Sequence, residues 1–138
     1  MPRILIIDDE TFVREALQRV LSSNATTVIG AADATCGLAA LGQSPVDLVI
    51  VDVVLPDMDG AAAIRQIRRD YPAVRIIAIS GGGNIGLDSY RPEAIATRAL
   101  LAACSAAGAH AVLPKPFETA ELRAVIDQVF STAQTYSV

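Results

Sequence analysis

The run from Leu48 to Val51, followed at once by Asp52, constrains the fold of this chain more than any other stretch. Consecutive apolar residues rich in β-branched side chains predict a strand that is buried on both faces, as in the interior of a parallel sheet. Leu55-Pro56 ends the strand because proline lacks the N–H that a sheet ladder needs, and the stretch 57–60 has turn chemistry. The sequence therefore predicts a carboxylate, that of Asp52, at the edge where open parallel sheets bind ligands.

Further apolar stretches predict strands before and after this one, and helical stripes of apolar residues lie between them. The expected strands are 3–7, 26–31, 48–51, 74–79 and 111–113, and the expected helices are 12–23, 34–41, 61–71, 92–107 and a last one capped by Thr119. Strands that alternate with helices through short loops favour a parallel sheet with helices on both faces, because crossover connections are right-handed. We therefore expect an α/β fold, doubly wound, with five strands and five helices.

Composition narrows the possible functions. The 138 residues are 52% hydrophobic, which suits one domain with a single core, and the formal net charge of -4 with no basic run gives no support to direct nucleic-acid binding. The apolar runs are strand-length, well short of the ~20 residues that a membrane span needs. Cys36 and Cys104 are isolated and the N-terminus has no signal-peptide pattern, so we expect a cytoplasmic protein without membrane insertion.

Polar side chains follow four of the five predicted strands. They are Asp8 and Asp9 after the first, Asp52 after the third, Ser80 after the fourth and Lys115 after the fifth. Because the carboxyl ends of parallel strands share one edge of a sheet, these groups are expected to meet there. Crowded carboxylates favour a hard cation such as Mg²⁺, and an ammonium and a hydroxyl suit phosphoryl oxygens. The pattern predicts a magnesium-assisted phosphoryl site with Asp52 as the nucleophile.

These motifs resemble the receiver domain of two-component response regulators, the CheY-like family. The residues that carry the resemblance are Ile6–Glu10, Val51–Gly60, Ser80, Gly108-Ala109 and Lys115-Pro116-Phe117, and the similarity extends from residue 3 to about residue 130. It implies the flavodoxin-like strand order 2-1-3-4-5 and a cis peptide between Lys115 and Pro116. It also implies a receiver domain over residues 1–131 and a short polar tail at 132–138, with no output domain.

The resemblance implies specific roles for the site residues. Asp52 would accept a phosphoryl group from a sensor histidine kinase or a histidine phosphotransfer protein, and Lys115 and Ser80 would contact that group. Mg²⁺ would be held by the carboxylates of Asp9 and Asp52 and by the backbone carbonyl of Val54, with Asp8 acting through water.

The same resemblance implies a phosphorelay switch rather than an enzyme with an external substrate. Self-phosphotransfer and autodephosphorylation would be its only reactions, and its output would pass to a downstream protein through the fourth helix, fifth strand and fifth helix. The sequence leaves a homodimer open, and it names no kinase, target or pathway.

Two departures from the family pattern stand out. Receivers carry Tyr or Phe on the fifth strand as a switch residue, and the matching position here is Val112. The interval from Ser80 to Gly108 is also longer than usual, which predicts an extended glycine-rich loop at 81–91. Our hypothesis is that this loop, with Tyr90, orders around the phosphoryl group and replaces the aromatic switch.

Other interpretations of the motifs remain. A receiver that is not phosphorylated and acts as a constitutive interaction module is the main alternative. Gly81, Gly83 and Gly86 formally match a dinucleotide fingerprint, but they follow the fourth strand rather than the first. A haloacid-dehalogenase-type hydrolase would need a second Asp at position 54, which is Val. His110, the only histidine, is predicted to be a surface loop residue.

Overall fold

The computed structural model describes residues 2–79 and 92–136, and strands and helices alternate along them. The elements are β1 (Arg3–Ile7), α1 (Thr11–Leu21), β2 (Thr27–Ala31), α2 (Ala34–Gln43), β3 (Leu48–Asp52), α3 (Gly60–Asp70), β4 (Arg75–Ile79), α4 (Pro92–Ala107), β5 (Ala111–Leu113) and α5 (Thr119–Tyr136). Each expected strand and helix is present, with bounds that differ by a few residues from the sequence prediction.

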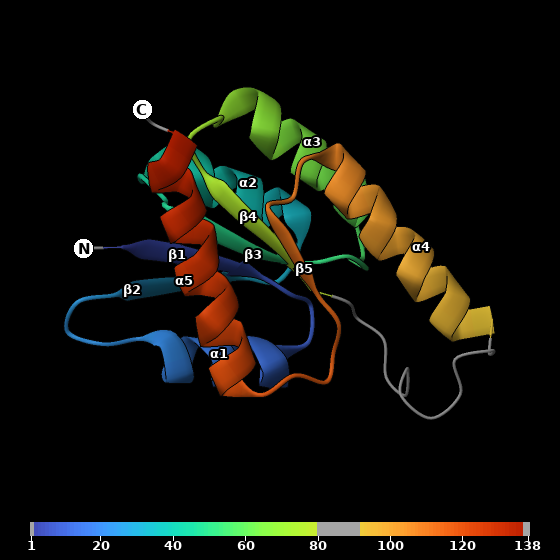
Figure 1. The fold of residues 1–138 in the computed structure, drawn as a ribbon, viewed down its shortest axis with the longest axis horizontal. Coiled ribbons are helices and arrows are strands. Elements are labelled where there is room, and N and C mark those ends of the chain that lie inside the picture. Colours follow the sequence, from blue (N-terminus) through green and yellow to red (C-terminus); the bar gives the residue numbers. More distant parts are fainter. Residues whose placement is uncertain (1, 80–91, 137–138) are drawn as a thin grey trace.

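The five strands form one parallel sheet in the order β2-β1-β3-β4-β5, which confirms the predicted α/β doubly wound fold (Figure 1). Helices α1 and α5 cover one face of the sheet and α2, α3 and α4 cover the other (Figure 1). The chain moves outward from β1 to β2 and then returns past β1 to β3. Loops at the carboxyl ends of β1 and β3 therefore lie side by side, as is usual where the strand order reverses.

Strand β3 is buried on both faces, as its apolar run predicts. Leu48 and Ile50 belong to the core under α1 and α5, whereas Val49 and Val51 belong to the core under α2, α3 and α4. All four side chains have no exposed surface. A central strand covered on both sides is rigid, so the carboxylate that follows it is held in a defined place.

Local signals define several helix ends. The Asp33 side chain accepts a hydrogen bond of 2.7 Å from the Cys36 N–H and so caps α2, as predicted. Gly108 has a φ of 118°, which is the left-handed conformation expected of a glycine after a helix. The peptide between Lys115 and Pro116 is cis, also as predicted.

The last helix extends into the stretch 132–138 that the sequence assigns to a polar tail, and that assignment stays a prediction. Helix α5 continues to Tyr136, and Thr119 is its first helical residue rather than its cap. No glycine or proline occurs within 119–136, so the backbone meets no local stop signal there. Among the described helices, none combines the length and the apolar character that crossing a membrane would require.

Candidate functional site

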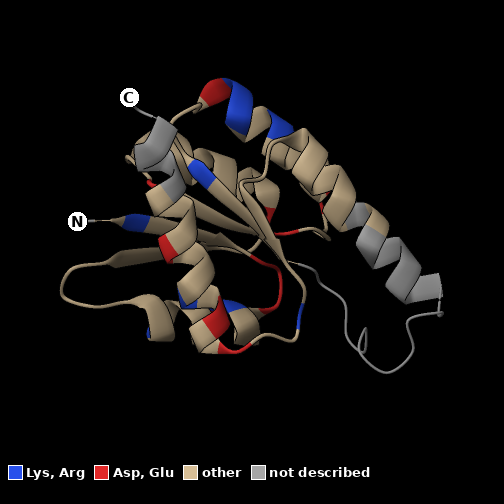
Figure 2. Ribbon diagram, in the orientation of Figure 1, with Lys and Arg blue, Asp and Glu red and all other residues tan. Residues whose placement is uncertain are grey.

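The site begins where β1 and β3 end next to each other. The two strands pair in parallel with Ile7 opposite Val51, so the next residues, Asp8 just after β1 and Asp52 at the end of β3, lie at the same level. Both are almost fully buried, with exposed fractions of 0% and 1%. Figure 2 shows acidic segments in red on the loops after β1 and β3 and a basic segment in blue on the loop after β5. The topology thus brings two buried carboxylates to one point.

Lys115 reaches these carboxylates from the loop after β5. Its Nζ lies 3.1 Å from Oδ2 of Asp8 and 3.4 Å from Oδ2 of Asp52, and Oε1 of Glu10 is 3.7 Å away. Burial by itself lowers the pKa of Lys115, but the negative charges of Asp52 and Asp8 outweigh burial and leave the pKa above its ordinary value. The ammonium therefore stays charged at neutral pH and bridges two acidic side chains.

The Asp52 carboxylate has an unusual environment. Burial raises its pKa to about 6, and the nearby Asp8 charge acts in the same direction, whereas the Val54 N–H and Lys115 favour the ionised form. The Val54 N–H donates a hydrogen bond of 2.9 Å to Oδ1, while Oδ2 lies toward Lys115. The two oxygens of Asp52 thus have different partners, and the carboxylate is mostly ionised at neutral pH.

Three carboxylates could share a cation here. Within residues 2–79 and 92–136, Asp8, Glu10 and Asp52 each offer an oxygen within 4.8 Å of the others. An all-oxygen, anionic donor set is the kind that Mg²⁺ prefers, so these residues fit the predicted metal. Asp9 is exposed and lies outside this trio, and its role and that of the Val54 carbonyl stay predictions.

Glu10 is the residue that the sequence prediction of the site missed. Its backbone N–H donates a hydrogen bond of 2.9 Å to Oδ1 of Asp8, which turns the chain so that the Glu10 side chain faces Lys115. The only signal in the sequence is its place in the acidic triplet 8–10. The sequence does not show which acidic side chains of such a triplet face the site, because this depends on the conformation of the turn.

Some predicted features lie outside the described residues or away from the site. Ser80, the loop 81–91 and Tyr90 are outside the described ranges, so the loop hypothesis stays a prediction. Val112 lies on β5 and is 37% exposed. It packs little, and its role in signalling also stays a prediction.

His110 is exposed, as expected of a surface residue, but it takes part in the edge of the sheet. Its Nδ1 accepts a hydrogen bond of 3.0 Å from the Ile76 N–H, and its own N–H donates to the Ile76 carbonyl at 2.8 Å. Burial first, and then the charges of Arg68 and Arg75, lower the pKa of His110. The imidazole therefore has a structural role at the β4–β5 edge.

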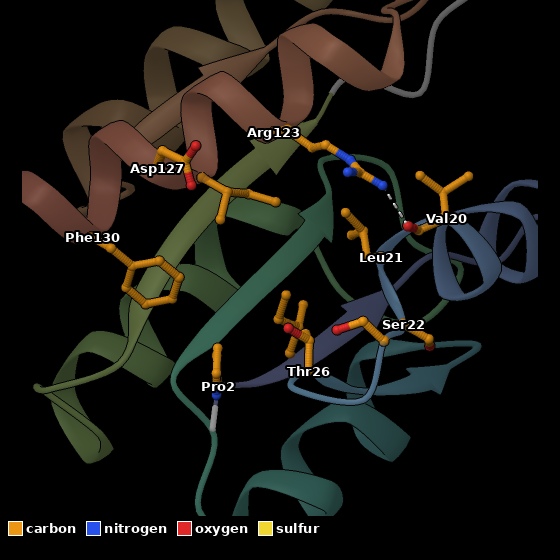
Figure 3. Close-up of a pocket in the computed structure, with 11 residues that line it drawn as sticks. Pro2, Val20, Leu21, Ser22, Thr26, Arg123, Asp127 and Phe130 are labelled. Carbon is orange, nitrogen blue, oxygen red and sulfur yellow. Dashed lines mark hydrogen bonds between the residues drawn. The ribbon is translucent and has the colours of Figure 1, made fainter.

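A pocket of about 370 Å³ lies at the opposite end of the sheet, against the first residues of β1, the end of α1 and the middle of α5 (Figure 3). Pro2, Leu21 and Phe130 are among its lining residues, and the Arg123 guanidinium donates a hydrogen bond of 2.9 Å to the Val20 carbonyl beside it. None of the acidic site residues lines this pocket. The pocket is therefore separate from the site around Asp52.

Comparison with known proteins gives consistent matches. Residues 4–127 match the family model of the response regulator receiver domain. The response regulator MprA of Mycobacterium sp. (strain KMS) is 34% identical over 109 residues, which cover 72% of this chain and 47% of that protein. The chain thus spans about half the length of these MprA relatives.

Solved structures match over almost the whole chain. The signal receiver domain of an HD domain-containing protein from Pseudomonas fluorescens Pf-5 has a TM-score of 0.80 and 29% identity, and the match covers 97% of this chain and 98% of that one. A CheY-like receiver domain protein from Methanospirillum hungatei JF-1 has a TM-score of 0.81 with 24% identity, covering 98% of both chains. The second likeness concerns the fold alone.

Proposed function

Because this chain belongs to the response regulator receiver domain family, we propose that Asp52 accepts a phosphoryl group from a phosphohistidine donor and that this modification switches the protein. The donor would be a sensor histidine kinase or a histidine phosphotransfer protein of a two-component system. The observation that carries the proposal is the position of Lys115, whose Nζ lies within 3.4 Å of oxygens of both Asp8 and Asp52.

The state of Asp52 suits a nucleophile. A carboxylate whose pKa is about 6 is mostly ionised at neutral pH, and burial leaves it poorly solvated. In the proposed reaction an oxygen of Asp52 forms a bond to phosphorus while the bond between phosphorus and the histidine nitrogen breaks. The electron pair of the broken bond stays on the imidazole, and an acyl phosphate remains on Asp52.

Lys115 would stabilise the transferred group. The ammonium already lies beside Oδ2 of Asp52, and a phosphoryl group on this carboxylate would bring new oxygens within its reach. Mg²⁺ would be held by the carboxylates of Asp8, Glu10 and Asp52. The family pattern adds Asp9 and the Val54 carbonyl to this set. When bound, Mg²⁺ supplies positive charge that offsets the charge of the phosphoryl oxygens.

The proposed role is a signalling switch rather than an enzyme that acts on an external substrate. Slow autodephosphorylation would return it to the resting state. The signal would reach a downstream protein through the surface of α4, β5 and α5, as in the family, and the setting of such a phosphorelay is the cytoplasm.

Intact mass after incubation with acetyl phosphate and Mg²⁺ tests this proposal. We expect a single phosphoryl addition that requires Mg²⁺ and that disappears in Asp52→Ala. An addition of the same size in Asp52→Ala would assign the reaction to another residue and contradict the proposal. No addition to the natural protein, together with no heat of Mg²⁺ binding in a calorimetric titration, would favour the constitutive interaction module instead.

A further inference from the structure

Asp57, in the loop between β3 and α3, is bonded to the start of a helix that precedes it by more than twenty residues. Its Oδ1 accepts a hydrogen bond of 3.0 Å from the Ala34 N–H. Its Oδ2 accepts one of 2.9 Å from the Thr35 N–H and one of 2.6 Å from the Thr35 hydroxyl. A single carboxylate thus makes three hydrogen bonds to the first turn of α2.

The same helix end has a second and separate cap. Asp33 precedes α2 directly and accepts the hydrogen bond of the Cys36 N–H at 2.7 Å. The first N–H groups of a helix have no partner within the helix and need an external acceptor. Asp33 satisfies one of them locally, whereas Asp57 satisfies those of Ala34 and Thr35 from another loop. Of these two caps, Asp57 is the one that connects α2 to the segment that follows Asp52.

The two ends of the loop that follows Asp52 are held close together. Val54 pairs with Asp59 in an antiparallel bridge, and the Gly60 N–H donates to the Val53 carbonyl at 3.2 Å. The approach is so close that a Cβ on Gly60 would lie 2.6 Å from the Cα of Val53. The loop is therefore closed at its base beside the site. Asp57 belongs to the stretch between the two bridged residues, Val54 and Asp59.

The base of this loop contacts the nucleophile directly. The Val54 N–H donates the 2.9 Å hydrogen bond to Oδ1 of Asp52, and the Val54 carbonyl is the ligand that the family pattern assigns to Mg²⁺. A shift of the loop that reaches its base would move both groups. The bonds from Asp57 to α2 fix the part of the loop that the bridge at its base does not hold.

We propose that Asp57 is a positioning residue for the phosphorylation site, and this inference rests on the proposed function. By fastening the loop to the first turn of α2, Asp57 keeps the Val54 N–H on Asp52 and the Val54 carbonyl in place for Mg²⁺. Asp57 touches neither the phosphoryl group nor the metal, and its effect passes through the loop.

Asp57→Ala and Asp33→Ala form a matched pair for the test, because each removes an aspartate cap from the same end of α2. Amide hydrogen exchange on the full chain is the first measurement. We expect Asp57→Ala to speed exchange at residues 53–59 as well as at the start of α2, and Asp33→Ala to speed it at the start of α2 alone. Equal loop protection in the two variants would overturn the inference.

Calorimetric titration with Mg²⁺, at a temperature where both variants are folded, is the second measurement. We expect Asp57→Ala to weaken Mg²⁺ binding about tenfold, as is typical when a group that orients a metal ligand is lost, with little change in Asp33→Ala. A general loss of helix stability would affect both variants alike. Equal Mg²⁺ affinities would therefore also overturn the inference.

Phosphorylation by acetyl phosphate separates this inference from the proposed function. At saturating Mg²⁺ we expect Asp57→Ala to recover most of the natural maximal rate, since bound Mg²⁺ would itself hold the Val54 carbonyl, and with it the Val54 N–H, in place. Failure of the proposed function would appear in the natural protein, as no phosphorylation at Asp52. Failure of the role of Asp57 would appear only as the lack of a difference between the two variants.

Discussion

The ammonium nitrogen of Lys115 lies 3.1 Å from Oδ2 of Asp8, although 107 positions separate the two residues along the chain. The same nitrogen is 3.4 Å from Oδ2 of Asp52. Two buried carboxylates therefore share one cation, and a second cation or a phosphoryl group would change the balance of charge among all three groups. This relationship has measurable consequences.

Replacing Lys115 with Met should separate metal binding from phosphoryl transfer. Without the ammonium, the carboxylates repel each other more, and the positive charge that opposes an incoming cation is gone, so Mg²⁺ binding should tighten severalfold. Transfer from acetyl phosphate should slow by about a hundredfold, because a charge that stabilises the transferred group is lost. Calorimetry and intact mass measure the two effects. Lys115→Arg keeps the charge and serves as the control, and a parallel fall in binding and transfer would contradict the prediction.

The ionised carboxylate of Asp52 should lower the free energy of unfolding at neutral pH when no metal is present. Its pKa of about 6 in the folded protein lies above the ordinary aspartate value of 3.8, so the folded state binds this proton more tightly than the unfolded state. The contribution of Asp52 to the free energy of unfolding should therefore rise as the pH falls from about 6 to about 4. Asp52→Asn, which carries no charge, should be more stable than the natural protein at pH 7.5 by roughly 3 kcal/mol, since the pKa is shifted by about two units and each unit corresponds to about 1.4 kcal/mol.

Urea denaturation in the presence of a metal chelator measures this difference. At pH 4 the natural carboxyl group is protonated and resembles the amide, so the two midpoints should come together. An Asp52→Asn variant that is less stable than the natural protein at pH 7.5 would refute the prediction.

His110 should make the sheet edge sensitive to acid. The Nδ1 of the neutral imidazole accepts the hydrogen bond of the Ile76 N–H, and burial with the charges of Arg68 and Arg75 lowers the pKa of His110 below the ordinary histidine value of 6.5. As the pH falls, the unfolded state therefore takes up this proton before the folded state does. The stabilising contribution of neutral His110 is present above about pH 6.5 and is lost as the pH falls through the pKa of His110 in the folded protein.

His110→Asn keeps an acceptor for the Ile76 N–H and removes the titration. We expect the natural protein to lose more stability than this variant between pH 7.5 and pH 5, measured from urea midpoints. The other titrating groups, Asp52 included, contribute to both proteins and cancel in the difference. Identical pH profiles would show that protonation of His110 has no effect on the edge.

Replacing either of two glycines with alanine should change the free energy of unfolding, but in opposite directions. A Cβ on Gly60 would lie 2.6 Å from the Val53 backbone, so Gly60→Ala should lower the free energy of unfolding by about 1–3 kcal/mol. A Cβ on Gly42, in helix α2, would meet only the Tyr71 hydroxyl at 3.6 Å, and Gly42→Ala should raise it by about 0.5–1 kcal/mol. Thermal unfolding of both variants tests the pair, and a change of the same sign in each would contradict the explanation from backbone contact.

Much of the fold and part of the site could be predicted from the sequence. The apolar runs identify the strands, and the rule that the carboxyl ends of parallel strands share one edge predicts that Asp8, Asp52 and Lys115 meet. This prediction depends on the topology alone, because it requires only the order of strands and loops.

Features that depend on loop conformation could not be predicted in this way. Glu10 rather than Asp9 faces Lys115 because a turn bonds the Glu10 N–H to Asp8, and Asp57 caps α2 because two distant loops meet beside the sheet. The sequence alone does not distinguish the acidic loop residues that make such contacts from those that do not.

The sequence by itself determined the doubly wound sheet, the burial of β3 and the position of Asp52 at its end, because the spacing of apolar residues along the chain identifies strands, helices and their buried faces. Only the tertiary structure decided which acidic side chain shares Lys115 and which helix holds the loop after Asp52. Those choices depend on distances of a few ångströms between segments far apart in the chain, and such distances arise only when the strands and helices have packed together.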